Sequence, residues 1–290
     1  MKLKSLALAT GLAVAMLSGA ANALTLPTGG DFNFEDDNKE RVLTPDGNGG
    51  YIAKTSGSLA AGDVLAAVVE FNAITYPDQS VFKTLQGPDY VYGYSVIEIA
   101  SIAGGVATFK PFAAFEATYG AGSMVALFNG DTGLDLSCTT IGACEGNAAG
   151  GATYGPLWAT FGIGDTSDYW FAGGSAPFNI SLDLATLATL NANTKVAVAN
   201  YGLSVLTNNT GYLFNEQACP ICAIVNPASD GTAHIIGSGD VLGGAGLAGP
   251  YQARSDFDFG FNAVPEPGTL ALLGMGLLGM GWSARRRTAK

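Results

Sequence analysis

The fold class is decided by residues 64–74, which read Val64-Leu-Ala-Ala-Val-Val-Glu-Phe-Asn-Ala-Ile74. This run is rich in β-branched residues and ends at the turn-forming Tyr76-Pro77-Asp78, so it predicts a β-strand. Residues 90–99 alternate in side-chain character, and Gly104-Gly105 separates them from a further apolar run at residues 106–109. This spacing predicts a hairpin with a two-residue turn.

The rest of the chain repeats this pattern of short apolar runs bounded by Gly, Asn, Asp or Pro. Further strands are expected at residues 124–128, 157–163, 169–171, 178–184, 195–206, 233–236 and 256–262. So many short strands predict a mainly β domain, with a β-sandwich or jelly-roll-like architecture in which two sheets bury alternate side chains. Residues 182–190 place Leu184, Leu187 and Leu190 three apart, which predicts a short helical insertion that Asp183 caps. We expect the Gly-rich residues 237–249 to form a flexible loop, because the lysine of a phosphate-binding loop is missing.

Composition excludes one large class of function. The chain has 290 residues with 13 basic and 24 acidic side chains, a formal charge of −11. Nucleic-acid-binding proteins concentrate Lys and Arg to neutralise phosphates, so nucleic acid is not an expected partner. Because 48% of the residues are hydrophobic, the chain has enough apolar side chain to build a core.

The N-terminus has the three parts of a secretory signal peptide. Lys2 and Lys4 precede an uncharged apolar run over residues 5–20, and small residues follow at Ala21 and Ala23. This order predicts a signal peptide over residues 1–23, cleaved after Ala23. A buried N-terminal helix is the alternative, but the apolar run has no polar face. We therefore expect an exported β-rich domain over residues 24–263.

The C-terminus combines a proline-rich turn, an apolar run and a basic cluster. Val264-Pro265-Glu266-Pro267 precedes the apolar residues 270–282, and Arg285-Arg286-Arg287 follow. The run is short, since a membrane-spanning helix needs about 20 residues. The prolines nevertheless end the folded domain, and the arginines stop translocation and stay in the cytoplasm. Residues 264–290 are thus predicted to hold a single transmembrane helix.

This arrangement closely resembles the PEP-CTERM sorting signal of Gram-negative bacteria that make extracellular polysaccharide. The resemblance implies that an exosortase, a membrane-embedded cysteine transpeptidase, recognises Pro265, Glu266 and Pro267 and removes the tail. Residues 270–282 would be the temporary inner-membrane anchor, and Arg285, Arg286 and Arg287 the retention signal. The chain is then a substrate of the sorting enzyme, located at the cell surface or in the extracellular matrix. An ordinary anchor that is never cut is the alternative.

Four cysteines, Cys138, Cys144, Cys219 and Cys222, would meet an oxidising compartment after export. An even count there predicts disulfides, and four cysteines allow three connectivities. The simplest connectivity is local, with Cys138 bonded to Cys144 and Cys219 to Cys222. A four-cysteine zinc site and a redox role for Cys219-Pro-Ile-Cys222 are less favoured alternatives.

Two acidic clusters suggest calcium, namely residues 31–37 with Asp31, Glu35, Asp36 and Asp37, and residues 46–50 with Asp46. The second cluster departs from a calcium-binding loop, because Tyr51 stands where a glycine is required. We therefore expect solvated turn acids and neither a resident metal nor a cofactor, with calcium as the alternative.

Catalytic residue types are few. His234 is the single histidine and lies in an expected strand, and no Gly-x-Ser-x-Gly sequence occurs. Two carboxylates would suffice for a glycosidase, but nothing distinguishes a pair among the candidates. These candidates are Glu70, Glu98, Glu116, Asp165 and Asp168. We therefore expect a protein that is not an enzyme.

Aromatic side chains offer a second kind of site, since sugar-binding surfaces stack pyranose rings on exposed aromatic rings. Tyr90, Tyr92 and Tyr94 share one face of an expected strand, and Tyr169-Trp170-Phe171 lie beside acidic residues. Burial in a core or in a cross-strand ladder is the favoured alternative for both groups.

These observations together predict an exported surface or extracellular-matrix protein, processed by exosortase. A structural or adhesive role in exopolysaccharide, biofilm or floc follows from the family resemblance, with extracellular polysaccharide as the expected partner. A lectin-like carbohydrate-binding module and a secreted glycoside hydrolase are the two alternatives.

Overall fold

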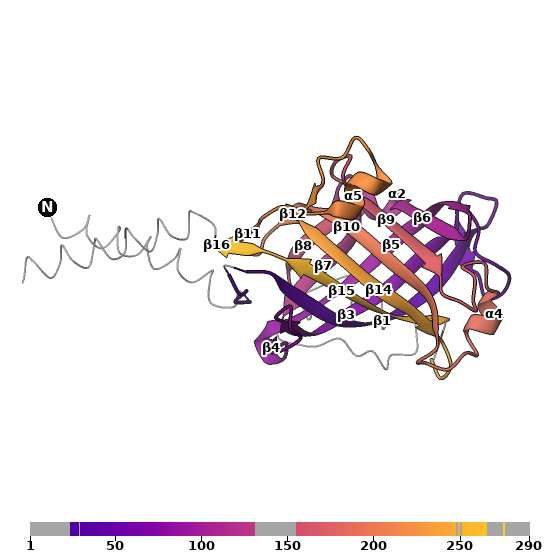
Figure 1. Ribbon diagram of the computed structural model, residues 1–290. Helices are drawn as coiled ribbons and strands as arrows, with labels where there is room; N and C mark the ends of the chain where they lie inside the picture. Colours follow the sequence, from indigo (N-terminus) through magenta and orange to yellow (C-terminus); the bar gives the residue numbers. More distant parts are fainter. Residues whose placement is uncertain are drawn as a thin grey trace, which may run out of the picture.

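A computed structural model describes residues 24–28, 30–130, 155–247, 249, 251–265 and 275 (Figure 1). One large sheet dominates it. Its strands are β1 (Phe32–Pro45), β2 (Tyr51–Ala53), β3 (Val64–Thr75), β4 (Val81–Thr84), β5 (Tyr90–Ala103), β6 (Val106–Pro111), β7 (Ser123–Gly130), β8 (Leu157–Gly162), β9 (Tyr169–Gly174), β10 (Lys195–Asn208), β14 (Ile235–Gly243) and β15 (Ala253–Phe261). The chain is mainly β, as its sequence predicts.

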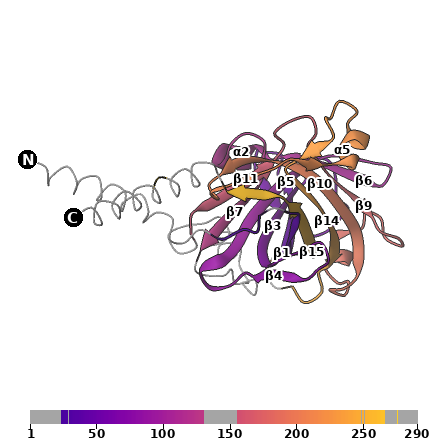
Figure 2. The same ribbon diagram turned by 60° about the vertical axis from the view of Figure 1, so that its left-hand side comes forward.

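The large sheet closes on itself. Antiparallel neighbours follow one another in the order β3, β1, β15, β14, β10, β8, β7 and β5, and β5 pairs with β3 again. Strands β5 and β10 are long enough to pair with two strands in succession along one edge. Strand β5 pairs first with β7 and then with β6, and β10 pairs with β9 and then with β8. Because β6 also pairs with β9, these two strands connect β5 to β10 alongside β7 and β8. Figure 2 shows the strands wrapping around one interior. Opposite walls thus face each other like the layers of a sandwich, but hydrogen bonds join them on both sides.

The interior is the main hydrophobic core. Phe34 on β1 is 0% exposed, and its ring lies 4.9 Å from Phe259, 5.0 Å from Phe261, 5.2 Å from Phe71 and 5.9 Å from Trp158, measured between centroids. Alternation along the strands places these side chains on the same inner face of the sheet. Close packing of large rings in one enclosed space makes this cluster a principal source of stability.

Smaller elements cover the outside of the sheet. Helix α2 (Ala113–Tyr119) buries Phe115 against the outer face of β5 and β7, where Tyr92 stacks on Phe128. Helix α4 (Leu184–Leu187) buries Leu184 and Leu187 in a separate cluster with residues of β1, β10 and β15. The remaining elements are η1 (Gly87–Asp89), α5 (Pro220–Val225) and the ribbons β11 (Tyr212–Phe214) with β16 (Ala263–Pro265) and β12 (Gln217–Ala218) with β13 (Thr232–Ala233).

Several local predictions are confirmed. Residues 64–75 and 90–103 are strands, and Gly104 and Gly105 form the turn of the β5–β6 hairpin with positive φ values of 59° and 82°. Asp183 caps α4, because its carboxylate accepts hydrogen bonds from the backbone amides of Ala185 and Thr186. Positive φ at both turn positions explains why glycine stands at each of them.

Other local predictions are wrong. Residues 178–183 are not a strand, since they form turns that lead into α4. Residues 237–243 are not a flexible loop, because they belong to β14, which pairs with both β10 and β15. Packing explains the glycine at position 237, where a Cβ atom would lie only 2.2 Å from the Tyr201 ring. The strand β1, rich in charged residues, was not expected at all.

Candidate functional site

A short ribbon holds the start of the proline motif. Strand β16 pairs with β11, and the last pair in the register joins Tyr212 to Pro265. Ala263 is fully buried, and the Phe214 ring opposite it packs 6.1 Å from Phe261 in the core. The Asn208 side chain donates a hydrogen bond to the Tyr212 carbonyl at 2.6 Å. Pro265 is therefore held by the folded domain, and its missing N–H makes it a natural strand end.

A groove of about 540 Å³ lies on the outer surface between β6, β9 and α5. Tyr169 and Phe171 line it with rings stacked at 5.6 Å, and Lys110 and Thr108 contribute polar groups. Asp168 borders the groove, and its carboxylate accepts hydrogen bonds from the backbone amides of Gly164 and Asp165 at 2.6 and 3.0 Å. Burial raises the pKa of Asp168 above its usual value, although these amide bonds oppose the shift.

A family model for the PEP-CTERM protein-sorting motif matches residues 263–287. The chain carries a PEP-CTERM sorting motif. The match begins at Ala263, the first residue of β16, so the motif overlaps the last strand that the structure describes. The PEP-CTERM motif indicates a bacterial protein that is exported and sorted to the cell envelope or surface, and it implies processing by exosortase. No curated protein and no solved structure matches the chain.

Most residues of the predicted signal peptide and of the PEP-CTERM signal lie outside the described residues. This holds for the signal-peptide residues Ala21 and Ala23, for Glu266, Pro267, the apolar residues 270–282 and the cluster Arg285, Arg286 and Arg287, with the exception of Met275. Across the part of the chain that the structure describes, no helix combines the length and apolar character needed to cross a membrane. Of the PEP-CTERM recognition element, Pro265 is thus the residue that the structure places.

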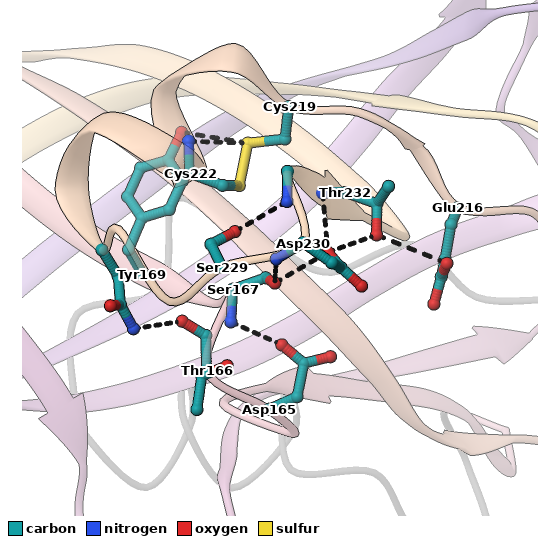
Figure 3. The surroundings of a disulfide bond; sticks show 12 residues. Asp165, Thr166, Ser167, Tyr169, Glu216, Cys219, Cys222, Ser229, Asp230 and Thr232 are labelled. Atoms are coloured by element: carbon teal, nitrogen blue, oxygen red, sulfur yellow. Dashed lines mark hydrogen bonds between the residues drawn. A yellow bond between two sulfur atoms is a disulfide. The ribbon is translucent and has the colours of Figure 1, made fainter.

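The predicted disulfide between Cys219 and Cys222 is confirmed (Figure 3). Its Cα atoms are 5.3 Å apart, and both Cys219, the N-cap of α5, and Cys222, within α5, are buried. Cys219 Sγ lies 4.0 Å from the Tyr169 hydroxyl. A thiol that exchanges disulfides needs access to its partner, so this burial favours a structural bridge over the redox alternative. Cys138 and Cys144 lie outside the described residues.

Hydrogen bonds fasten the disulfide segment to the loop before β9. The Asp230 carboxylate accepts hydrogen bonds from Ser167 Oγ at 2.9 Å and from the backbone amide and hydroxyl of Thr232 at 2.9 and 2.8 Å (Figure 3). These bonds, those from Thr232 first, hold the pKa of Asp230 below its usual value. The Asn226 side chain also donates to the Thr166 carbonyl at 2.6 Å. The disulfide segment is therefore hydrogen-bonded to the loop that precedes β9, beside the outer groove.

The tyrosine face of β5 is part of the core. Tyr92 is fully buried, with its ring 6.1 Å from Phe128, and Tyr94 lies 6.0 Å from Phe115 of α2. The alternative of a buried aromatic ladder is thereby confirmed, and sugar binding at Tyr92 is excluded because no ring face is exposed. On β9, the rings of Tyr169 and Phe171 stack on each other in the groove, whereas Trp170, which also borders the groove, packs against Tyr201 and Phe109.

The carboxylates considered for glycoside hydrolysis have structural partners. Glu98 pairs with Lys110 at 3.0 Å, and Glu116 accepts a hydrogen bond from the Gly122 amide at 2.7 Å. Asp165 accepts one from the Ser167 amide at 2.6 Å, in the same loop as Asp168. The other two residues considered for chemistry lie elsewhere, Glu70 on β3 and His234 between β13 and β14.

The two acidic clusters have different structures. Asp46 is a turn acid as predicted, since its carboxylate accepts hydrogen bonds from the amides of Asn48 and Gly50. The prediction of turn acids is wrong for residues 35–37, which lie within β1, and Asp36 is only 6% exposed. Asp36 instead meets Asp256 and Asp258 of β15, so that carboxylate oxygens from all three lie within 4.8 Å of one another. Sequence reasoning missed Asp256 and Asp258, since no local pattern connects them to β1.

Proposed function

We propose that this protein is an exosortase substrate whose β-domain is delivered to the cell surface or extracellular matrix, where it acts as a structural or adhesive component. The PEP-CTERM motif at residues 263–287 carries this proposal. In it, Pro265, Glu266 and Pro267 are the recognition element and the following apolar run is a temporary anchor in the inner membrane.

The position of the last described strand supports processing. This strand, β16, ends at Pro265, so a cut beyond this residue removes none of the described strands. The β11–β16 ribbon and the buried Ala263 side chain fix the start of the motif on a folded support. Cleavage beyond Pro265 would thus separate the rest of the sorting signal from the β-domain without unfolding the β-domain.

Processing is tested by expressing the chain in cells with and without an exosortase. With the enzyme, intact mass spectrometry of the surface fraction should show a chain that lacks the residues beyond the motif. The Glu266→Gln variant should accumulate uncut in the membrane fraction. The matched control is Glu216→Gln, an exposed glutamate outside the motif, which should be processed like the wild type. Normal processing of the Glu266→Gln variant would refute recognition through this residue.

A second function, binding of carbohydrate, is favoured by the outer groove. Its volume of about 540 Å³ suits a small ligand, and an aromatic floor with polar edges is the chemistry that sugars require. Phe171 is partly exposed there, and Lys110 reaches the rim. We propose a non-catalytic role for the groove, because the carboxylates near it bind backbone amides or Lys110.

Carbohydrate binding is tested by retention of the protein on polysaccharide purified from the producing cells. Phe171→Ala should reduce retention, whereas Phe82→Ala, which removes a partly exposed ring elsewhere, should not. Equal retention of the two variants would remove the groove from the proposal. Release of reducing sugar by the wild type would instead support the hydrolase alternative.

A further inference from the structure

We propose that Asp36, Asp256 and Asp258 form a calcium site that clamps β1 to β15. Asp36 lies on β1, early in the chain, and Asp256 and Asp258 lie on β15, late in the chain. Carboxylate oxygens of the three residues lie within 4.8 Å of one another. Oxygen atoms from carboxylates and amides are the ligands that calcium takes, six to eight at a time. The site is independent of the sorting motif and of the outer groove.

The backbone ladder is interrupted where the carboxylates meet. Strands β1 and β15 are in register at Phe34 with Phe259 and again at Asn38 with Ser255, and no pair is formed between these two. Asp36 lies in this gap, and Asp256 and Asp258 flank the position of β15 that the same register places opposite Asp36. A bound cation would therefore join the strands at the point where their hydrogen-bonded pairing is missing.

A buried amide beside Asp36 gives independent support for a ligand. Asn38 is 5% exposed, and its Nδ2 donates to Asp36 Oδ2 at 2.9 Å, which places this buried amide group next to the cluster. Among the described residues, Asn38 Oδ1 is a buried acceptor that receives no hydrogen bond, and Asp258 Oδ1 is another. Buried acceptors without a donor are costly, and a divalent cation satisfies such oxygens directly.

The local electrostatics agree with this geometry. Burial first, and then the neighbouring charges of Asp256 and Glu35, raise the pKa of Asp258 to about 6. The Tyr201 hydroxyl donates to the Asp258 carbonyl at 3.0 Å, which fixes this part of β15 against β10. Concentrated negative charge on a fixed backbone is the arrangement that a calcium ion would stabilise.

Calcium is favoured over magnesium by the shape of the site. Magnesium requires near-ideal octahedral geometry and retains several waters, whereas calcium accepts irregular sets of carboxylate and amide oxygens. The ligands here come from two strands with an interrupted register, and the amide oxygen of Asn38 is buried. We therefore expect weaker binding of magnesium than of calcium.

The test is a calorimetric titration of the purified full chain, freed of metal with a chelator, with calcium chloride at neutral pH. The wild type should bind one calcium ion per chain, and Asp256→Asn and Asp258→Asn should each weaken binding at least about tenfold, since each removes one charged ligand. The matched control is Asp240→Asn. Asp240 lies opposite Asp256 in the β14–β15 register and pairs with Lys195 at 2.6 Å, outside the cluster.

A thermal unfolding scan of each protein, with calcium and with chelator, supplies the second readout. Calcium should raise the unfolding temperature of the wild type and of Asp240→Asn, and it should raise that of Asp256→Asn and of Asp258→Asn by less. Asp256 is exposed, so its variant should fold. The site is overturned if calcium up to 10 mM gives no binding heat, if Asp256→Asn binds like the wild type, or if Asp240→Asn weakens binding equally.

Discussion

Replacing Phe34 by alanine should destabilise the domain strongly, because its ring is at the centre of the closed sheet. The side chain is 0% exposed and its ring lies within 5.9 Å of those of Phe71, Trp158, Phe259 and Phe261, measured between centroids. A buried Phe→Ala change costs about 3–5 kcal/mol, and each aromatic pair adds about 0.5–1.5 kcal/mol to simple burial. With four ring partners, we expect the upper part of that range, about 4–5 kcal/mol.

The measurement is equilibrium unfolding in urea, followed by tryptophan fluorescence. For a domain of this size, a loss of 4 kcal/mol lowers the urea midpoint by about 2 M or the melting temperature by roughly 8–16 °C. Phe82→Ala is the matched control, because that ring is 38% exposed and contacts Phe32 and Tyr76 at the edge. We expect about 1 kcal/mol for the control. A loss below about 2 kcal/mol for Phe34→Ala, or equal losses for both variants, would refute the assignment of the core.

Three further predictions concern stability. Replacing Cys219 and Cys222 by serine should lower the free energy of unfolding by about 2 kcal/mol, the value for so short a loop, and an unchanged urea midpoint would contradict a structural role. Burial raises the pKa of Glu40, so this carboxyl group ionises in the unfolded chain at a lower pH than in the folded protein. The free energy of unfolding should therefore fall as pH rises above 4.5. In a pH series of melting temperatures, Glu40→Gln should show a smaller fall than the wild type. An equally steep fall in the variant would exclude Glu40 as its source. Gly93→Ala should lower the free energy of unfolding by about 1–3 kcal/mol, because its Cβ would lie 2.4 Å from a leucine methyl. The control Gly173→Ala should lower it little, because the nearest atom to its Cβ would be 3.9 Å away. Equal melting temperatures of the two variants would contradict this packing.

Features encoded by neighbouring residues were predictable from the sequence. The strands at residues 64–75 and 90–103 follow from β-branched and alternating patterns, and the hairpin turn follows from Gly104-Gly105. The Asp183 cap and the Cys219–Cys222 bridge are local as well. The sorting motif is also contiguous, which explains why its order alone identified it.

Features that depend on distant residues were not predictable. Strand β1 carries Asp36, Asn38 and Glu40 on positions that face inward, so polar side chains obscure the alternation expected of a strand. The glycines of β14 suggested a loop because the Tyr201 ring that requires one of them lies on another strand. Closure of the sheet by the β3–β5 pairing is not a local property at all.

The candidate cation site shows the same limit. The sequence suggested calcium binding at Asp36 together with nearby acidic residues of the same segment. In the structure, the carboxylates grouped with Asp36 are those of Asp256 and Asp258. Only the antiparallel pairing of β1 with β15 brings the three carboxylates together. The Asn38 Oδ1 acceptor, which receives no hydrogen bond, is buried by the fold in a way that no sequence pattern reveals.

Sorting by exosortase is tested most directly by the mass of the protein recovered from the cell surface. If the tail is removed at the Pro-Glu-Pro element, peptide mapping of the surface fraction should find the β16 residues Ala263–Pro265 and no peptide from residues 268–290. The same fraction from cells without the exosortase should contain no processed chain. An intact peptide from residues 268–290 in the surface fraction of exosortase-containing cells would contradict the proposed function.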